Sequence, residues 1–514
     1  MHARILPAIA LATVLVGCTA SHPRGPTPTT RPALTTAGPA PTSTGPTSTS
    51  AAGPAPLTWA ACAGHAGWDC ATLAVPLDHA HPGRTIGIAL SRHRAKAGSR
   101  RGSLLVNPGG PGDSGITFLY SAIQVTFDPK LVDDFDIIGF DPRGVGQSTP
   151  VHCADGPALD RYLHVEPNPT TPDQIAAVVA ATKEFTAGCA ARSGDLLKFV
   201  STADAARDME DIRVAVGDPK LTFLGFSYGT YLGATYAALF PTHIRAMALD
   251  GALDPTLDGG QSAVAQAAAF EHNLNAFLAD CTAKGSTCVF KAHGAPSLRA
   301  AFDALSARID AHPIPVGARS LGPGEALFGI ALPLYDRAAW PILAQSLEEA
   351  QGGNGATLLK VFDEYAQRTP DGHFSNLLES NNAVNCLDHP GPTSVERFQA
   401  LAAQAAHVAP YFGGPLAWSG LACLYWPVPP TGHPGPIAAP GAPPIVVVGS
   451  TDDPATPYDG AVHLAAGLGS SAILVTRHGE GHTGYLSSDC VKADIDSYLI
   501  DLTPPANRDC ASSP

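Results

Sequence analysis

A serine flanked by glycines stands where an apolar segment gives way to a helical one. Residues 221–224 are Leu-Thr-Phe-Leu, residues 225–229 are Gly-Phe-Ser-Tyr-Gly, and a helical pattern then runs to Leu239. A turn this tight between strand and helix accepts only glycines two residues either side of the serine. The pattern predicts a nucleophile elbow that exposes the hydroxyl of Ser227, with the amides of the next helix pointing at the reacting centre.

An aspartate and a histidine, the two partners that a catalytic serine needs, each follow a predicted strand later in the chain. The apolar run 444–448 predicts a strand, and Asp453 follows its carboxyl end. The next apolar run, 472–475, leads to His482. We take Asp453 as the acid that orients His482, with Asp452 as the alternative, because a loop pattern does not fix a position to within one residue. The order serine, aspartate, histidine is that of the α/β-hydrolases.

A loop with few side chains follows another predicted strand. Residues 103–106 are apolar enough for a buried strand, and residues 107–112 read Asn-Pro-Gly-Gly-Pro-Gly. Such a backbone approaches a substrate closely, which suits an oxyanion hole formed by the amides of Gly110 and Tyr228. The other interpretation is an ordinary Gly/Pro turn. Together with the serine, aspartate and histidine, this loop predicts acyl transfer through a covalent acyl-enzyme.

Several motifs of the chain, taken together, point to one family. They stand at residues 107–112, 136–146, 225–230, 249–251 and 453–457. In this combination the chain resembles the secreted tripeptidyl aminopeptidases of the proline-iminopeptidase group, from about Trp59 to Cys510. The resemblance implies an α/β-hydrolase fold with an inserted helical cap, a serine peptidase mechanism, and release of short peptides from free N-termini.

The resemblance also implies that the cap meets the ammonium group of the substrate, around residues 381–386. Glu379 and Asp388 flank this stretch and are the candidate substrate-binding carboxylates, although acidic residues on a cap are commonly solvated. The chain departs from its relatives at Asn385, where they often carry a glutamate. Three more polar residues at strand ends are expected to have structural roles in turns and ion pairs: Asp141, Arg143 and Asp250.

The chain divides into a sheet domain and an insertion. Short apolar strands alternate with helices over residues 57–255, and the same alternation resumes over residues 441–514. This predicts one parallel sheet that is interrupted in sequence. Residues 256–440 show long Ala- and Leu-rich helical periodicity, which predicts a helical cap over the strand ends.

The N-terminal residues predict export and a lipid anchor. A positively charged start precedes a short apolar run, and residues 15–18 read Leu-Val-Gly-Cys. This indicates a lipoprotein signal peptide over residues 1–18, with lipid on Cys18; the alternative is an ordinary secretory signal. Residues 19–56 are nearly all Pro, Thr, Ser, Ala and Gly, which predicts an extended tether. We expect an extracytoplasmic protein that is anchored to the cell membrane or secreted.

The cysteines fit an oxidising compartment. The chain has eleven, and assigning Cys18 to lipid leaves ten, enough for five disulfides. Closely spaced metal-ligand pairs of the Cys-x-x-Cys type are absent, so we expect no metal site. Proximity in sequence predicts the pairs Cys62–Cys70, Cys153–Cys189, Cys281–Cys288, Cys386–Cys423 and Cys490–Cys510.

Charge and motifs narrow the function classes further. The formal net charge of −14 argues against a nucleic-acid partner, and no motif calls for a cofactor. The sequence favours an exported serine exopeptidase that acts on peptides; the alternative is a carboxylesterase or lipase of the same fold. A binding lipoprotein on an inactive hydrolase scaffold would need a broken triad, which the sequence does not show. Turnover of peptide amides against acyl esters separates the two enzymes.

Overall fold

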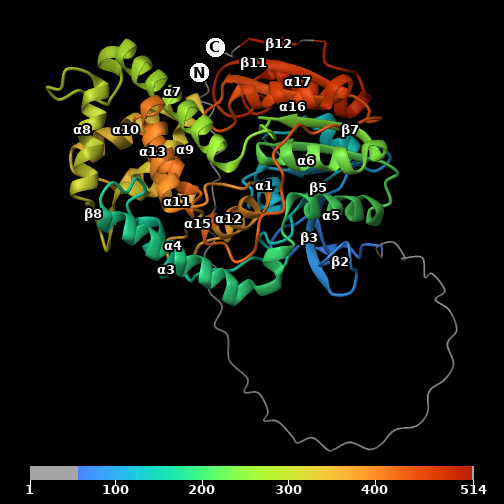
Figure 1. The fold of residues 1–514 in the computed structure, drawn as a ribbon. Coiled ribbons are helices and arrows are strands. Elements are labelled where there is room, and N and C mark those ends of the chain that lie inside the picture. The colour runs from blue at the N-terminus through green and yellow to red at the C-terminus, as the bar shows by residue number, and fades with distance from the viewer. Residues whose placement is uncertain (1–55, 124, 507, 512–514) are drawn as a thin grey trace, which may run out of the picture.

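The computed structural model describes residues 56–123, 125–506 and 508–511. Cys18, the expected signal segment and the expected tether up to residue 55 lie outside the described residues. The described chain forms a sheet with helices on both faces, and a separate group of helices lies to one side of that sheet (Figure 1).

The sheet is mixed and has ten strands in the order β1-β2-β3-β5-β4-β6-β7-β10-β11-β12. The pairs from β1 to β5 are antiparallel, and all later neighbours pair in parallel. The strands are β1 (Ala60–Ala61), β2 (Trp68–Pro76), β3 (Thr85–His93), β4 (Gly102–Asn107), β5 (Phe135–Phe140), β6 (Leu221–Phe226), β7 (Ile244–Asp250), β10 (Ile445–Asp452), β11 (Ala472–Glu480) and β12 (Asp509–Cys510).

Continuous apolar strands are buried on both faces because side chains alternate along a strand. In β4, Leu104 and Val106 pack on one face and Leu105 on the other. The first face is covered by α1 (Gly115–Ala122), α2 (Pro129–Asp134) and α17 (Asp489–Asp501). The second is covered by α5 (Thr202–Ala215), α6 (Tyr228–Leu239) and α16 (Tyr458–Leu468). This is the α/β-hydrolase arrangement that the sequence predicts.

The cap is inserted between β7 and β10 and has a hydrophobic core of its own. Its elements are α7 (Gly259–Lys284), α8 (Leu298–Ala311), β8 (Ile314–Val316), β9 (Arg319–Leu321), α9 (Pro323–Leu334), α10 (Trp340–Gln351), α11 (Ala356–Tyr365), α12 (Leu377–Asp388), α13 (Val395–Val408), α14 (Gly413–Ser419) and α15 (Leu421–Leu424). Short 3-10 helices lie at Gly194–Lys198, Pro241–His243, Gly285–Thr287, Arg337–Ala339 and Gly469–Ser471.

Two helices that precede β6 in sequence also pack on the cap. They are α3 (Gly156–His164) and α4 (Pro172–Ser193). Leu163 of α3 belongs to the hydrophobic core of the cap. Val178 of α4 packs in a further cluster with Phe398 and Trp418. The helical layer beside the sheet is therefore built from two separate stretches of the chain (Figure 1).

The cysteine pairing predicted from the sequence is confirmed. Disulfides join Cys62–Cys70, Cys153–Cys189, Cys281–Cys288, Cys386–Cys423 and Cys490–Cys510. Structural disulfides persist in oxidising compartments, so the five bonds indicate an extracytoplasmic protein. In the part of the chain that the structure describes, no helix has both the length and the apolar character needed to cross a membrane.

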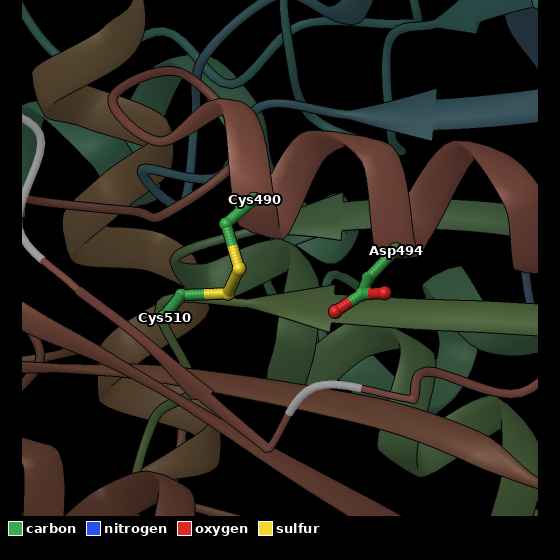
Figure 2. Close-up of side chains that lie close together, drawn as sticks. All are labelled: Cys490, Asp494 and Cys510. Atoms are coloured by element: carbon green, nitrogen blue, oxygen red, sulfur yellow. A yellow bond between two sulfur atoms is a disulfide. The ribbon is translucent and has the colours of Figure 1, made fainter.

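The bond between Cys490 and Cys510 joins α17 to β12, and Asp494 lies beside it (Figure 2). Two sulfurs and a carboxylate so close together resemble a set of metal ligands. Thiolates bind metal ions, however, and these two sulfurs are bonded to each other. The disulfide therefore joins α17 to the last strand of the sheet, and its sulfurs offer no thiolate ligand.

Arg143 has the structural role expected of it, in the loop after β5. Its side chain is about 1% exposed, and its Nε donates to Asp208 at 2.7 Å. Its Nη2 also donates to Asp208, and three further N–H groups reach the carbonyl oxygens of Pro76, Leu77 and Phe199 at 2.8–3.0 Å. The guanidinium is buried, paired with a carboxylate and fully hydrogen-bonded. It therefore links the end of β2, α5 and the loop after β5 to one another.

Asp141, two residues earlier, also has the expected structural role. Its carboxylate accepts from the hydroxyl of Ser114 at 2.6 Å and from the amide of Gln147 at 2.9 Å. These bonds join the start of α1 to the loop after β5. Burial raises the pKa of Asp141, although these donors oppose the shift.

Replacing Arg143 by Met should lower the free energy of unfolding by about 3–5 kcal/mol, because the change leaves Asp208 buried without its cation. Urea denaturation followed by circular dichroism measures this loss. The matched control is Arg161→Met, which removes an exposed arginine paired with exposed Glu184 and should change stability by less than about 1 kcal/mol. Equal effects of the two changes would contradict the structural role of Arg143.

Candidate active site

Ser227 lies between β6 and α6 in a conformation that few side chains adopt. Its backbone has φ 53° and ψ −124°. A Cβ at Gly225 would collide with the carbonyl oxygen of Gly229, and a Cβ at Gly229 would come within 2.8 Å of the carbonyl oxygen of Asn107. Both glycines are therefore required, as expected for an elbow that holds a serine in a strained turn.

His482 and Asp453 form a direct pair. Nδ1 of His482 lies 2.9 Å from each carboxylate oxygen of Asp453. The same carboxylate accepts from the amides of Ala455 and Thr456 at 2.9 and 2.8 Å, so backbone donors hold it in place. These contacts leave Nε2 of His482 as the nitrogen available for reaction.

Asp452, the alternative acid, lies elsewhere. Its side chain is about 34% exposed, and its carboxylate is 3.1 Å from Nε2 of His272 on α7. β10 ends between the two aspartates: Asp452 is its last residue, and Asp453 begins the loop that turns toward His482. Of the two carboxylates, the structure brings Asp453 to the histidine.

The pKa of His482 reflects two opposing effects. Burial alone would lower it, because the charged imidazolium loses solvent. The charge of Asp453 and its hydrogen bond outweigh burial, and Asp250 adds to them, so the pKa of His482 is raised above its ordinary value of 6.5. A raised pKa makes the imidazole a stronger base for a nearby hydroxyl.

The end of β7, at Asp250 and Gly251, contacts both Ser227 and His482. The amide of Ser227 donates to the carbonyl oxygen of Asp250 at 2.9 Å. A Cβ at the next residue, Gly251, would come within 3.1 Å of the His482 ring. The Asp250 carboxylate accepts from the amides of Gly484 and Tyr485 at 2.8 and 2.7 Å, which fixes the loop after His482. Asp250 therefore has the structural role expected of it.

The cap reaches His482 through Tyr335, just after α9. The amide of His482 donates to the carbonyl oxygen of Tyr335 at 2.8 Å. The phenol ring lies edge-on to the imidazole, with centroids 5.3 Å apart. No sequence pattern identifies this residue, because it is one of many aromatic residues in a helical region and its partner lies 147 positions away in the chain.

The glycine-rich loop and the elbow lie side by side. The amide of Gly109 donates to the Oδ1 of Asn107 at 3.1 Å, whereas within the described ranges no acceptor pairs with the amide of Gly110 or of Tyr228. A Cβ at Gly109 would lie 2.9 Å from the Cβ of Ser227 and 3.1 Å from the amide nitrogen of Tyr228. Glycine at 109 thus keeps the space beside the amide of Tyr228 open.

The two cap carboxylates predicted to bind substrate both have partners in the core. Glu379 accepts from the amides of Cys153 and Ala154 at 2.5 and 2.9 Å. Asp388 accepts from the amide of Thr202 at 3.0 Å and from its hydroxyl at 2.5 Å. Burial raises the pKa of Asp388 to about 7 against these bonds. In this geometry both carboxylates join α12 to the core.

Asn385, where the chain departs from its expected relatives, lies on the same helix. Its side-chain amide donates to Asn381 at 3.0 Å, and the side-chain amide of Asn381 donates to the carbonyl oxygen of Pro111 at 3.0 Å. α12 therefore meets the glycine-rich loop through two neutral asparagines.

Comparisons with known proteins agree with the fold. A family model described as alpha/beta hydrolase fold matches residues 102–288, and one described as TAP-like protein matches residues 409–510. The serine protease Hip1 of Mycobacterium tuberculosis is 36% identical over 460 residues, which cover 86% of this chain and 87% of that protein.

Two further relatives have different names. A protein of M. tuberculosis named carboxylesterase B is 35% identical over 451 residues, covering 86% of each chain. The tripeptidyl aminopeptidase of Streptomyces coelicolor is 32% identical over 466 residues, covering 86% of this chain and 84% of that one. The chain therefore belongs to the TAP-like family of hydrolases with the α/β-hydrolase fold, among relatives named serine protease and tripeptidyl aminopeptidase.

Proposed function

We propose that the protein is an exported serine exopeptidase that cleaves peptides near a free N-terminus, with Ser227, His482 and Asp453 as its catalytic triad. The observation that carries the proposal is the pairing of His482 with both oxygens of buried Asp453, next to the strand end that holds the elbow. Relatives named tripeptidyl aminopeptidase and serine protease support a peptide substrate.

The chemistry follows from the positions of these groups. The Ser227 hydroxyl attacks the scissile carbonyl carbon, and Nε2 of His482 takes the hydroxyl proton. The amides of Gly110 and Tyr228 stabilise the oxyanion. The intermediate then collapses: the C–N bond breaks, and the imidazolium returns its proton to the leaving amine. Water activated by His482 hydrolyses the acyl-enzyme and regenerates Ser227.

The alternative is a carboxylesterase, and one observation favours it: a relative at 35% identity is named carboxylesterase B. The same serine, histidine and oxyanion amides open esters as well as amides. What separates the two functions is the acyl group and the leaving group, which the triad does not determine.

An unblocked tripeptidyl anilide should be cleaved to release the intact tripeptide, and N-acetylation should reduce kcat/KM sharply. Ser227→Ala should lower kcat by roughly 10⁶-fold, because the triad acts as a unit. Mass analysis identifies the products, and a p-nitrophenyl ester measured alongside tests the alternative. Equal rates on free and acetylated peptides would contradict an exopeptidase, and turnover of the ester alone would favour the carboxylesterase.

Replacing Asp453 by Asn should lower kcat by about 10⁴-fold, because the imidazole loses the partner that sets its tautomer. The pH profile should change too. The raised pKa of His482 places the acid limb of kcat/KM above pH 6.5 in the wild type, and loss of the Asp453 charge should move that limb to lower pH. Asp452→Asn is the matched control. If that change proved the more damaging, the acid would be wrongly assigned.

We also propose that the mature protein is anchored by lipid on Cys18. The proposal rests on the Leu-Val-Gly-Cys motif that ends a short apolar run. Cys18→Ser should move the protein out of the membrane fraction and change the mass of the mature N-terminus, because each buried acyl CH₂ contributes about 0.8 kcal/mol to membrane binding. Ser21→Ala is the control. Unchanged fractionation and mass for Cys18→Ser would indicate an ordinary secretory signal.

A further inference from the structure

Asp113 stands at the junction of the core and the cap, just after the glycine-rich loop. It is half-buried, and its Oδ1 accepts from the side-chain amide of Gln367 at 2.8 Å. Gln367 is the neutral partner of this carboxylate, and no lysine, arginine or histidine of the described chain forms an ion pair with it. Burial raises the pKa of Asp113, and the bond from Gln367 opposes the shift.

The free oxygen of this carboxylate lies next to the groups proposed to act on the substrate. A Cβ at Gly110 would be 3.5 Å from Oδ2 of Asp113, so this oxygen lies close to the residue whose amide is proposed for the oxyanion hole. After burial, the charge of Asp113 is among the causes that raise the pKa of Tyr335 and of Tyr365, the latter to about 12. Tyr335 in turn packs against His482.

The cap holds Gln367 in the position needed for this contact. Its φ of 50° is uncommon for a residue other than glycine. Its carbonyl oxygen accepts from the amide of Ser375 at 3.1 Å, and its side-chain oxygen accepts from the hydroxyl of Ser375 at 2.6 Å. With that oxygen occupied, the NH₂ group of Gln367 faces Asp113. Strained residues of this kind persist where the surrounding contacts determine them, often at ligand sites.

The Asp113 carboxylate is thus partly buried and has a neutral hydrogen-bond donor but no cation as a partner. A desolvated carboxylate with one neutral donor is unfavourable, and a bound ammonium supplies both the missing charge and hydrogen bonds. Glu379 and Asp388, in contrast, already accept bonds from the core.

We propose that Asp113 binds the N-terminal ammonium of the peptide substrate and is a specificity-determining residue of this enzyme. The inference rests on the proposed exopeptidase function and deepens it. In this arrangement the loop that supplies an oxyanion amide also supplies the carboxylate that selects a free amine, while the cap contributes Gln367 to orient it.

The test compares Asp113→Asn with the wild type on an unblocked tripeptidyl anilide and on its N-acetyl form. Asparagine keeps the size of the side chain and an oxygen for Gln367 but removes the charge. The change should reduce kcat/KM for the free amine roughly 10- to 100-fold, mainly through KM, and leave the acetylated substrate within about twofold. Asp113→Glu, which keeps the charge, should retain more of the preference for the free amine.

Asp371→Asn is the matched control, because Asp371 is an exposed carboxylate in the cap segment that carries Gln367. It should leave both rates unchanged. Glu379→Gln and Asp388→Asn are measured in parallel, and a selective loss on the free amine in either, but not in Asp113→Asn, would overturn the inference. The outcomes separate the two proposals: a wild type without preference for the free amine contradicts the exopeptidase itself, whereas a preference that survives Asp113→Asn contradicts only the role of Asp113.

Discussion

The site depends on the close approach of three backbone segments at the carboxyl ends of neighbouring parallel strands. The loop after β4 and the elbow after β6 lie within van der Waals distance of each other, because a Cβ at Gly109 or at Gly229 would crowd the other segment. A Cβ at Gly251, in the turn after β7, would crowd His482 instead. The bond from the Ser227 amide to the Asp250 carbonyl oxygen joins two of the three segments. Steric packing of the backbone therefore fixes the position of Ser227.

Buried charges then position the groups around Ser227. Asp453 is held by backbone amides and raises the pKa of His482, while Asp250 uses its carboxylate to fix the loop that follows the histidine. The two acids sit near the same imidazole but have different tasks, because only Asp453 contacts the ring nitrogen. Arg143, farther away, links β2, α5 and the loop after β5 through its hydrogen bonds.

Local signals in the sequence were enough for the fold and for much of the candidate site. Apolar runs that end in glycine or aspartate placed Ser227, Asp453 and His482 at strand ends, and pairing each cysteine with its neighbour in sequence order predicted the disulfides. Contacts across the cap could not be predicted. Asp113 and Gln367 lie 254 positions apart, and nothing in either local pattern indicates that they meet. The packing of α3 and α4 on the cap is likewise a long-range result.

The polar contacts between cap and core bear on which carboxylate is available to a substrate. An acidic residue on a cap helix looks free in sequence, yet Glu379 and Asp388 accept bonds from amides of the core, and their loss would leave those amides unsatisfied. Asp113 presents the reverse arrangement, with the carboxylate in the core and the neutral donor in the cap. A neutral partner orients the carboxylate without neutralising it, so the charge stays available for a ligand that arrives with its own.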